Sequence, residues 1–312
     1  MLPEKVVFAT NVNSMTGAGH IRRLFEISKQ LPASIEKHFF GTIELTWVKR
    51  LIQEDFLESQ SQENYDEDTF VILDSYEREF CLLVNSVFPH SKIIQLADRF
   101  TFLLPRAKII FLDLPFPYEK KSTESRVIAH GIEFLPVRHF ESRKPIFVGR
   151  AERVFVTTGG IVNDNIFSQL IQELVNEKYR DIEFEFMGLP KFHDVKYPNI
   201  RFHELGNTFD QIASLCDSSI SAAGTTLWDL LANQILVGSV AVVENQKANL
   251  NFAVESGQAL EIFDPKTLKL NTDSFQSLLF DENLRQDIFL KISGRYDFYG
   301  AKRISEAILS AL

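Results

Sequence analysis

The chain has 312 residues, 45% of them hydrophobic, and a formal net charge of −9. This length can bury two large cores, and the excess of 42 acidic over 33 basic residues argues against a nucleic-acid-binding protein, because affinity for the phosphate backbone requires clustered lysine and arginine. No apolar run reaches the ~18–20 residues of a membrane span, and residues 1–10 lack the features of a signal peptide. We therefore expect a cytoplasmic protein without a transmembrane segment or nucleic-acid partner; the oligomeric state is left open.

Short apolar runs alternate with longer amphipathic runs, which is the pattern of βαβ units and a parallel sheet. In the first half we expect strands at 5–10, 36–40, 43–47, 69–73, 92–95 and 108–112, and helices at 19–31, 48–57, 76–88 and 97–104. Between about 115 and 152, prolines and clustered charges interrupt the pattern. We expect an interdomain linker there.

The second half resumes the alternation. We expect strands at 153–157, 182–187, 199–203, 218–221, 236–243 and 259–263, and helices at 164–178, 208–215, 225–233, 246–256, 274–279, 281–292 and 298–311. The chain therefore predicts two doubly wound, Rossmann-like α/β domains at 1–140 and 151–312. In such folds ligands bind at the carboxyl ends of the strands, so we expect the two domains to face an interdomain cleft.

The first candidate for chemistry is the loop Gly17-Ala18-Gly19-His20, which follows the first predicted strand and opens a helix. Its glycines allow the backbone to approach a ligand, and a helix N-terminus attracts anions. An imidazole, with an ordinary pKa near ~6.5, can accept a proton at neutral pH. Taken alone, the motif is better explained by a histidine that only caps or solvates the helix start, and the further loops described next favour a binding site.

Other predicted strands end in similar loops. These are Asp74-Ser75-Tyr76, Thr157-Thr158-Gly159-Gly160, Ala222-Ala223-Gly224-Thr225-Thr226 and Glu244-Asn245-Gln246. Small residues and hydroxyls at a helix start can hold a diphosphate through backbone amides without lysine, although a tight turn with a helix cap would explain each pair by itself. Side-chain amides suit sugar hydroxyls because they both donate and accept, and a polar first turn is the alternative.

Several other classes of site are disfavoured. The seven histidines show no metal-binding spacing, and the chain lacks the Gly-x-Ser-x-Gly elbow of many hydrolases. Cys81 and Cys216 lie in apolar segments and are predicted to be buried thiols, and the 28 phenylalanines are predicted to pack in the core. We expect neither a metal nor a cofactor.

The order of these motifs resembles a known family. It is similar to the nucleotide-sugar hydrolases of pseudaminic acid biosynthesis, which act on UDP-2,4-diacetamido-2,4,6-trideoxy-β-L-altropyranose, to their spore-coat polysaccharide relatives, and more distantly to GT-B glycosyltransferases. The matching segments are Gly17–Arg23, Asp74–Tyr76, Leu96–Arg99, Gly131–Arg138, Thr158–Gly160, Ala223–Asp229, Glu244–Gln246 and Gly300–Ile304. The resemblance extends over nearly the whole chain and implies the GT-B architecture.

The resemblance also implies roles for individual residues. His20 would be the general base and Tyr76 would help to position the sugar. Nucleotide or phosphate binding would fall to Gly17, Gly19, Gly160, Gly224, Thr225, Thr226 and, at the ribose, Asp229; sugar binding would fall to Asp74, Asn245 and Gln246. The implied partner is a nucleotide sugar, whose glycosidic C–O bond would be hydrolysed.

The chain departs from the family pattern in four places. Ala9-Thr10-Asn11 replaces Arg-x-Asp, Ile161-Val162-Asn163 replaces Ser-Asp-Pro, Asp229 replaces Glu, and Asn233-Gln234-Ile235 replaces Gly-Val-Pro. The donor-binding frame is retained, while the identity of the sugar is left open. A glycosyltransferase of a surface glycan or of flagellin is therefore the alternative to a hydrolase, and a non-catalytic nucleotide-sugar-binding protein is the third reading.

Overall fold

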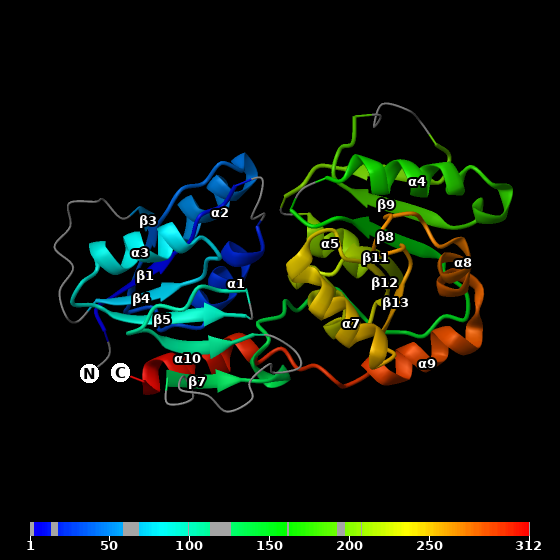
Figure 1. Ribbon diagram of the computed structural model, residues 1–312. Helices are drawn as coiled ribbons and strands as arrows, with labels where there is room; N and C mark the ends of the chain where they lie inside the picture. Colours follow the sequence, from blue (N-terminus) through cyan, green and yellow to red (C-terminus); the bar gives the residue numbers. More distant parts are fainter. Residues whose placement is uncertain are drawn as a thin grey trace. The chain divides into compact units, whose positions relative to one another are not determined.

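The computed structural model describes residues 3–13, 18–58, 69–98, 100–112, 126–160, 162–191, 197–206 and 208–311 (Figure 1). The chain divides into unit 1, formed by Met1–Val137 and Phe298–Leu312, and unit 2, formed by Arg138–Asp297. The expected ranges 1–140 and 151–312 put the last helix in the second domain, whereas it packs in unit 1. Each unit is built on its own parallel sheet.

Unit 1 contains a sheet of seven strands in the order β3-β2-β1-β4-β5-β6-β7. The strands are β1 (Lys5–Ala9), β2 (Glu36–Phe40), β3 (Leu57–Glu58), β4 (Phe70–Leu73), β5 (Lys92–Ala97), β6 (Lys108–Phe111) and β7 (Val127–His130). Its helices are α1 (Gly19–Ser28), α2 (Thr46–Asp55), α3 (Arg78–Val87), the 3-10 turn η2 (Ile132–Phe134) and α10 (Gly300–Ser310). All neighbouring strands run parallel.

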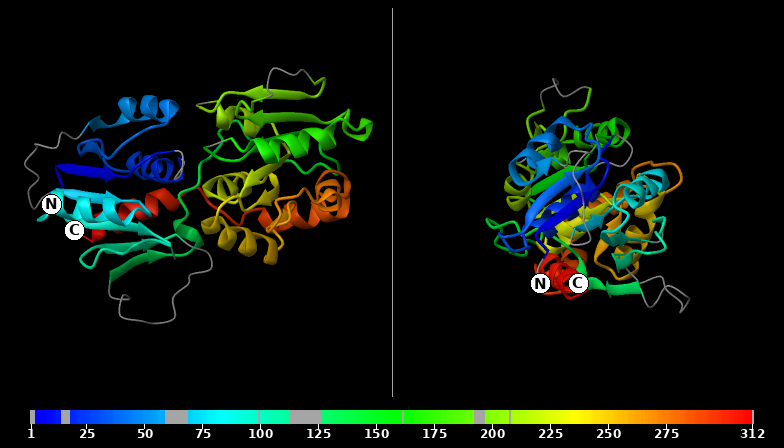
Figure 2. Two further views of the ribbon diagram at one scale, coloured as in Figure 1. Left: turned by 45° about the horizontal axis from the view of Figure 1, so that its top comes forward. Right: turned by 90° about the vertical axis from the view of Figure 1, so that its left-hand side faces the viewer.

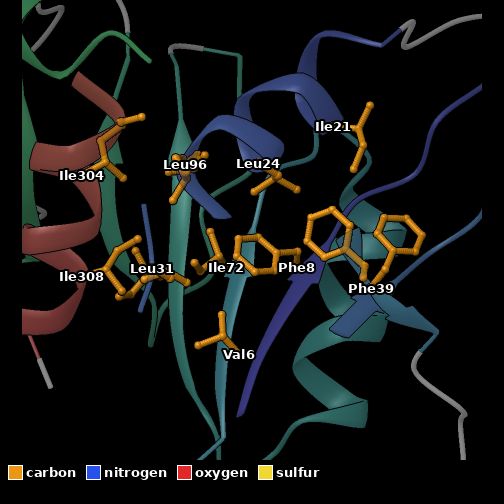
Figure 3. Close-up of a cluster of buried hydrophobic side chains, with 14 of the residues drawn as sticks. Val6, Phe8, Ile21, Leu24, Leu31, Phe39, Ile72, Leu96, Ile304 and Ile308 are labelled. Carbon is orange, nitrogen blue, oxygen red and sulfur yellow. The ribbon is translucent and has the colours of Figure 1, made fainter. Parts of the chain in front are cut away.

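The alternation of side chains along β1 sends its residues into two separate cores. Val6 and Phe8 lie in the cluster that α1, α2 and α10 cover, and Val7 and Ala9 lie in the cluster that α3 covers. Figure 3 shows the first cluster, to which Ile304 and Ile308 of α10 belong together with Val6 and Phe8 of β1. Both faces of the sheet are therefore buried, as expected for a parallel sheet.

Helix α10 is joined to unit 1 by an unusually close backbone approach. Its residues Ile304 and Ile308 are buried in the β1 core, and the helix contacts α1, β7 and η2 (Figures 1 and 2, red). A Cβ atom on Gly300 would lie 1.9 Å from the carbonyl oxygen of Leu135. Only glycine allows the helix to begin at this distance from the chain segment that leaves the sheet.

Gly300→Ala is expected to lower the free energy of unfolding by about 1–3 kcal/mol, because two backbone segments must separate to admit the methyl group. Gly206→Ala is the matched control, since a Cβ there meets no atom within 4 Å, and its effect should stay within about 0.5 kcal/mol. Urea unfolding of both variants measures the difference. Equal stability of the two variants would contradict the proposed close packing of α10.

Two elements expected in the first half are absent. Residues 43–47 alternate like a strand, but Ile43 forms only an isolated bridge with Val12, and α2 begins at Thr46. Residues 97–104 form a turn instead of a helix over the residues described there, because the Asp98 carboxylate accepts the Phe100 amide. Conversely, the four-residue edge strand β7 lies within the expected linker. It was not predicted because prolines interrupt the strand pattern around it.

Unit 2 contains a sheet in the order β10-β9-β8-β11-β12-β13. The strands are β8 (Arg153–Thr157), β9 (Glu183–Met187), β10 (Ile200–His203), β11 (Ser218–Ala222), β12 (Leu236–Val240) and β13 (Ala259–Glu261). The helical segments are α4 (Asp164–Leu174), η3 (Glu177–Tyr179), α5 (Phe209–Ser214), α6 (Thr225–Ala232), η4 (Glu244–Gln246), α7 (Lys247–Glu255), α8 (Thr272–Phe280) and α9 (Glu282–Ile292). These positions agree closely with the expected elements.

Helices cover both faces of this sheet as well. Residues of α4, α8 and α9 form one apolar core with alternate residues of the strands, whereas Phe209 of α5 packs against Phe155 on the opposite face at 4.9 Å between ring centroids.

Cys81 and Cys216 are buried free thiols, as predicted, and burial raises the pKa of Cys81 to about 12. Within the described ranges, no helix combines the length and apolar character needed to cross a bilayer.

Candidate functional site

Two motif loops of unit 1 meet where the strand order of the sheet reverses. Because β2 and β4 lie on either side of β1, the segments that follow β1 and β4 leave the sheet next to each other. Open α/β sheets bind ligands at this reversal point. His20, in the first turn of α1, and Asp74, directly after β4, are thereby brought together.

A buried hydrogen-bond network connects these residues. The Nδ1 atom of His20 lies 2.6 Å from Oδ1 of Asp74. Arg23, one turn further along α1, donates from Nη2 to the same oxygen at 2.8 Å and from Nε to Oδ2 at 2.9 Å. His20 is 4% exposed and Asp74 is 1% exposed. Both carboxylate oxygens of Asp74 are thus bonded within unit 1, which favours an orienting role over the direct sugar contact implied by the resemblance.

The charge of Asp74 determines which nitrogen of His20 carries a proton. Burial raises the pKa of the Asp74 carboxyl, but Arg23 and then His20 lower it by more, so that the pKa lies below its usual range. The ionised carboxylate only accepts hydrogen bonds, so the proton between Nδ1 and Oδ1 belongs to Nδ1. Nη2 of Arg23, 2.9 Å from Nδ1, then donates to the carboxylate and not to the ring. The lone pair of the imidazole is then on Nε2, which has no hydrogen-bond partner among the residues described. This is the tautomer that a general base requires.

Tyr76 lies against the imidazole. Its ring meets that of His20 edge to face, with the centroids 4.5 Å apart, and its phenol donates to Oδ2 of Asp98 at the end of β5. Asp98 is in turn fixed by the Phe100 amide at 2.8 Å. Sequence analysis included Asp98 in the segment Leu96–Arg99 that resembles the hydrolase family but predicted no role for it. Nothing in the sequence links Asp98 to a tyrosine 22 positions earlier.

The segment after β1 is held by hydrogen bonds between side chains. Nδ2 of Asn11 donates to Glu77 Oε2 at 2.6 Å, and Nδ2 of Asn13 donates to Glu77 Oε1 at 3.0 Å. Oδ1 of Asn11 accepts the Thr42 amide at 3.0 Å. One carboxylate and two amides thus connect the loops that follow β1, β2 and β4.

In unit 2 the strand order reverses between β8 and β11. The loops that contain Gly160 and Gly224 therefore leave adjacent strands at one edge of the sheet. Gly224 is the N-cap of α6 in an extended conformation, no side chain caps the helix, and its first turn contains Thr225 and Thr226 but no acidic residue. A first turn without a side-chain cap and the helix dipole favour an anion there.

The loop after β8 leads to a less suitable helix start. The Asn163 side chain caps α4 by accepting the Ile166 amide at 3.1 Å, and Asp164 adds a negative charge to the first turn. Gly159 has a φ of +90°, which favours glycine, and a Cβ there would meet no atom within 4 Å. The backbone at Gly159 is therefore uncovered, while α6 is the helix suited to a phosphate.

The amides after β12 lie beside α6. Nε2 of Gln246 is 3.5 Å from the position that a Cβ would take on Gly224, and its Oε1 accepts the Val242 amide at 2.9 Å. Asn249 donates to the carbonyl oxygen of Ala223 at 3.1 Å. Oδ1 of Asn245 is buried and has no hydrogen-bond partner in the described part of the chain. A ligand hydroxyl or N–H would satisfy this acceptor.

Asp229, the expected ribose ligand, pairs with Arg138 of the same unit. Its Oδ1 accepts the Arg138 amide at 2.9 Å, and its Oδ2 accepts Nε at 2.9 Å and Nη2 at 2.7 Å. The exposed fractions of the side chains are 8% for Asp229 and 7% for Arg138. Nη1 of Arg138 also donates to Asp210 at 2.6 Å, so all three guanidinium nitrogens donate to carboxylates. Sequence reasoning missed this partner, which is 91 positions away.

Two further predictions concern the glycines before α1 and the binding of a metal ion. Gly19 is the first residue of α1, whose first turn has no side-chain cap or acidic residue, while Gly17 lies outside the described residues. Over the residues described, no group of three or more histidine, cysteine, aspartate or glutamate side chains could hold a metal ion.

No protein-family model matches the chain, and no curated protein matches its sequence. Solved structures of similar fold include the glycotransferase of kitacinnamycin, with 12% identity, a TM-score of 0.66 and coverage of 98% of both chains. MurG of Acinetobacter baumannii has 13% identity and a TM-score of 0.61, with coverage of 99% of this chain and 100% of that one. A UDP-N-acetylglucosamine 2-epimerase has 11% identity and a TM-score of 0.59, with coverage of 98% and 96%.

These similarities extend over both units and define the class of fold. The protein has the GT-B fold of two Rossmann-like domains, as the sequence predicted. At identities of 10–13% the likeness establishes architecture. Function must be argued from the site itself, since one fold supports many activities.

Proposed function

We propose that the protein is a nucleotide-sugar hydrolase that cleaves the glycosidic C–O bond of a UDP-activated diacetamido-trideoxy sugar, as in the biosynthesis of pseudaminic-type acids. The observation that carries this proposal is the orientation of His20 by Asp74, which leaves Nε2 as a proton acceptor. Solved structures of the same fold bear the names of glycosyltransferases and of a UDP-N-acetylglucosamine epimerase, which supports a nucleotide sugar as the ligand.

In the proposed reaction, Nε2 of His20 accepts a proton from water while the water oxygen bonds to the anomeric carbon. The bond from this carbon to the glycosidic oxygen breaks, and UDP leaves with that oxygen. The charge on Asp74 stabilises the imidazolium that forms, and Arg23 keeps Asp74 ionised. Tyr76 restricts the ring by edge-to-face contact.

Unit 2 would hold the nucleotide. The first-turn amides of α6 suit the diphosphate without any lysine, which agrees with the negative net charge of the chain. The partnerless oxygen of Asn245 and the amide of Gln246 suit sugar hydroxyls or acetamido N–H groups. Stabilisation of the departing UDP by these groups would lower the barrier to C–O cleavage.

A glycosyltransferase is the second candidate, because the same base could activate an acceptor hydroxyl in place of water. The names of several solved structures of this fold favour it. A binding protein without catalysis remains as a third outcome, in which donor binds and is not consumed.

The deciding experiment incubates the protein with UDP-sugars, including UDP-N-acetylglucosamine, in water labelled with heavy oxygen. Hydrolysis is expected to release UDP and to place the label on the sugar. Turnover that begins only when a glycan or protein acceptor is added would identify a transferase, and binding without turnover would overturn both enzyme assignments. Asn245→Ala should weaken UDP-sugar binding about 3–10-fold in calorimetry, whereas the exposed Asn251→Ala should leave it unchanged.

A further inference from the structure

Unit 1 contains a cavity that the proposed reaction does not use. It has a volume of about 680 Å³ and lies where β2 ends, between α2 and α3. Small-molecule sites in proteins have volumes of ~300–1,000 Å³ and are mainly apolar with a few polar groups. The size of this cavity is therefore that of a ligand site.

Aromatic side chains from both faces of the sheet form its walls. Phe39 and Phe40 are consecutive in β2 and point to opposite faces, yet both line the cavity, which therefore wraps around the end of the strand. Phe40 stacks on Phe80 of α3 with the centroids 6.0 Å apart, and Phe39 packs in the core beside Ile52 of α2. The walls belong to the two hydrophobic cores and are preformed.

The rim of the cavity is built from rigid backbone. Gly41 has a φ of +143°, and a Cβ there would lie 1.9 Å from the carbonyl oxygen of Thr10, so only glycine fits. The next residue, Thr42, donates its amide and its hydroxyl to Oδ1 of Asn11, both at 3.0 Å. Asn11 in turn binds Glu77. The cavity is thus connected to the loops that carry the proposed active site.

The lining includes one exposed basic residue. Lys49 is the charged residue among the described residues of the lining, and no carboxylate pairs with it among the side chains that the structure describes. An exposed leucine, Leu83, lies at the opening and is 50% exposed. A lysine in a lining of aromatic and aliphatic side chains matches a ligand with an apolar body and one negative charge.

We propose that this cavity is a second binding site, for an organic anion with an apolar, ring-containing body. The aromatic walls would take up the body and Lys49 would pair with the anionic group. The site goes beyond the proposed function, since hydrolysis of a nucleotide sugar requires no second organic ligand. The site also does not depend on nucleotide binding in unit 2.

Anilinonaphthalene sulfonate, an aromatic anion that fluoresces in apolar sites, is the probe. The full-length protein should bind it saturably, and an excess of UDP should not displace it. Leu83→Glu, which places a negative charge at the opening, should weaken binding at least about tenfold, and Lys49→Gln should weaken it about threefold.

Matched controls lie next to each variant in the chain. Leu82→Glu alters the neighbouring residue of α3, which is 44% exposed and outside the lining, and Arg50→Gln alters an exposed cation outside it. Both should bind the dye as the unmodified protein does. Displacement of the dye by UDP, or equal binding by all variants, would overturn the second site. Neither result would affect the hydrolase proposal, which depends on UDP release.

Discussion

Replacing His20 with alanine is expected to lower the rate of UDP release by about 10²–10⁴-fold, the usual contribution of a general base. Asp74→Asn should cause a similar loss, because the amide can donate to Nδ1 and thereby favour the tautomer with a proton on Nε2. UDP affinity should be unchanged in both variants, since the nucleotide is assigned to unit 2. Steady-state kinetics and calorimetry measure the two effects separately.

Because His20 is buried, a second variant separates catalysis from folding. His20→Asn retains a side-chain N–H that can donate to Asp74 in place of Nδ1 but has no equivalent of Nε2. It should unfold near the temperature of the unmodified protein and still lose activity. His90→Ala, at an exposed position, is the control for a general effect of removing a histidine. Full activity of His20→Asn would exclude His20 as the base.

Replacing Arg138 with methionine is expected to reduce the free energy of unfolding by about 3–5 kcal/mol, because the carboxylate of Asp229 stays buried without its charged partner. Arg180→Met, at an exposed position without such a network, should change stability by less than about 0.5 kcal/mol. Urea unfolding provides the measurement. A small effect at Arg138 would show that Asp229 reaches water or another partner.

The same pair tests the ribose assignment of Asp229. In Asp229→Asn the guanidinium of Arg138 keeps its ion pair with Asp210, so the free energy of unfolding should fall by less than in Arg138→Met. If the carboxylate serves only this ion pair, UDP affinity should change little. A large loss of UDP affinity at unchanged stability would instead support the role at the ribose that the resemblance implies.

The order of strands and helices could be predicted from the sequence because it depends on local periodicity. Apolar runs such as Phe70–Leu73 form buried strands, and the amphipathic segment after His20 forms α1. The parallel arrangement then puts the loops after β1, β4, β8, β11 and β12 at the carboxyl edges of the sheets. Glycine, hydroxyl and amide residues in these loops therefore indicated candidate sites without any coordinates.

Local periodicity gave wrong predictions at two places, where a side-chain hydrogen bond or a single β-bridge takes the place of a regular element. Asp98 accepts a backbone amide and thereby forms a turn where helical spacing continued, and Ile43 forms one bridge where alternation predicted a strand. In both cases a few hydrogen bonds outweighed a weak periodic preference.

The partners of charged residues and of the last helix were decided by tertiary structure alone. Asp74 was expected at the sugar and Asp229 at the ribose, but their partners Arg23 and Arg138 are 51 and 91 positions away. Likewise, the sequence of α10 predicts an amphipathic helix without indicating the core that it covers. Periodicity encodes which face of an element is buried, whereas the surface that buries it depends on shape and charge contributed by distant residues.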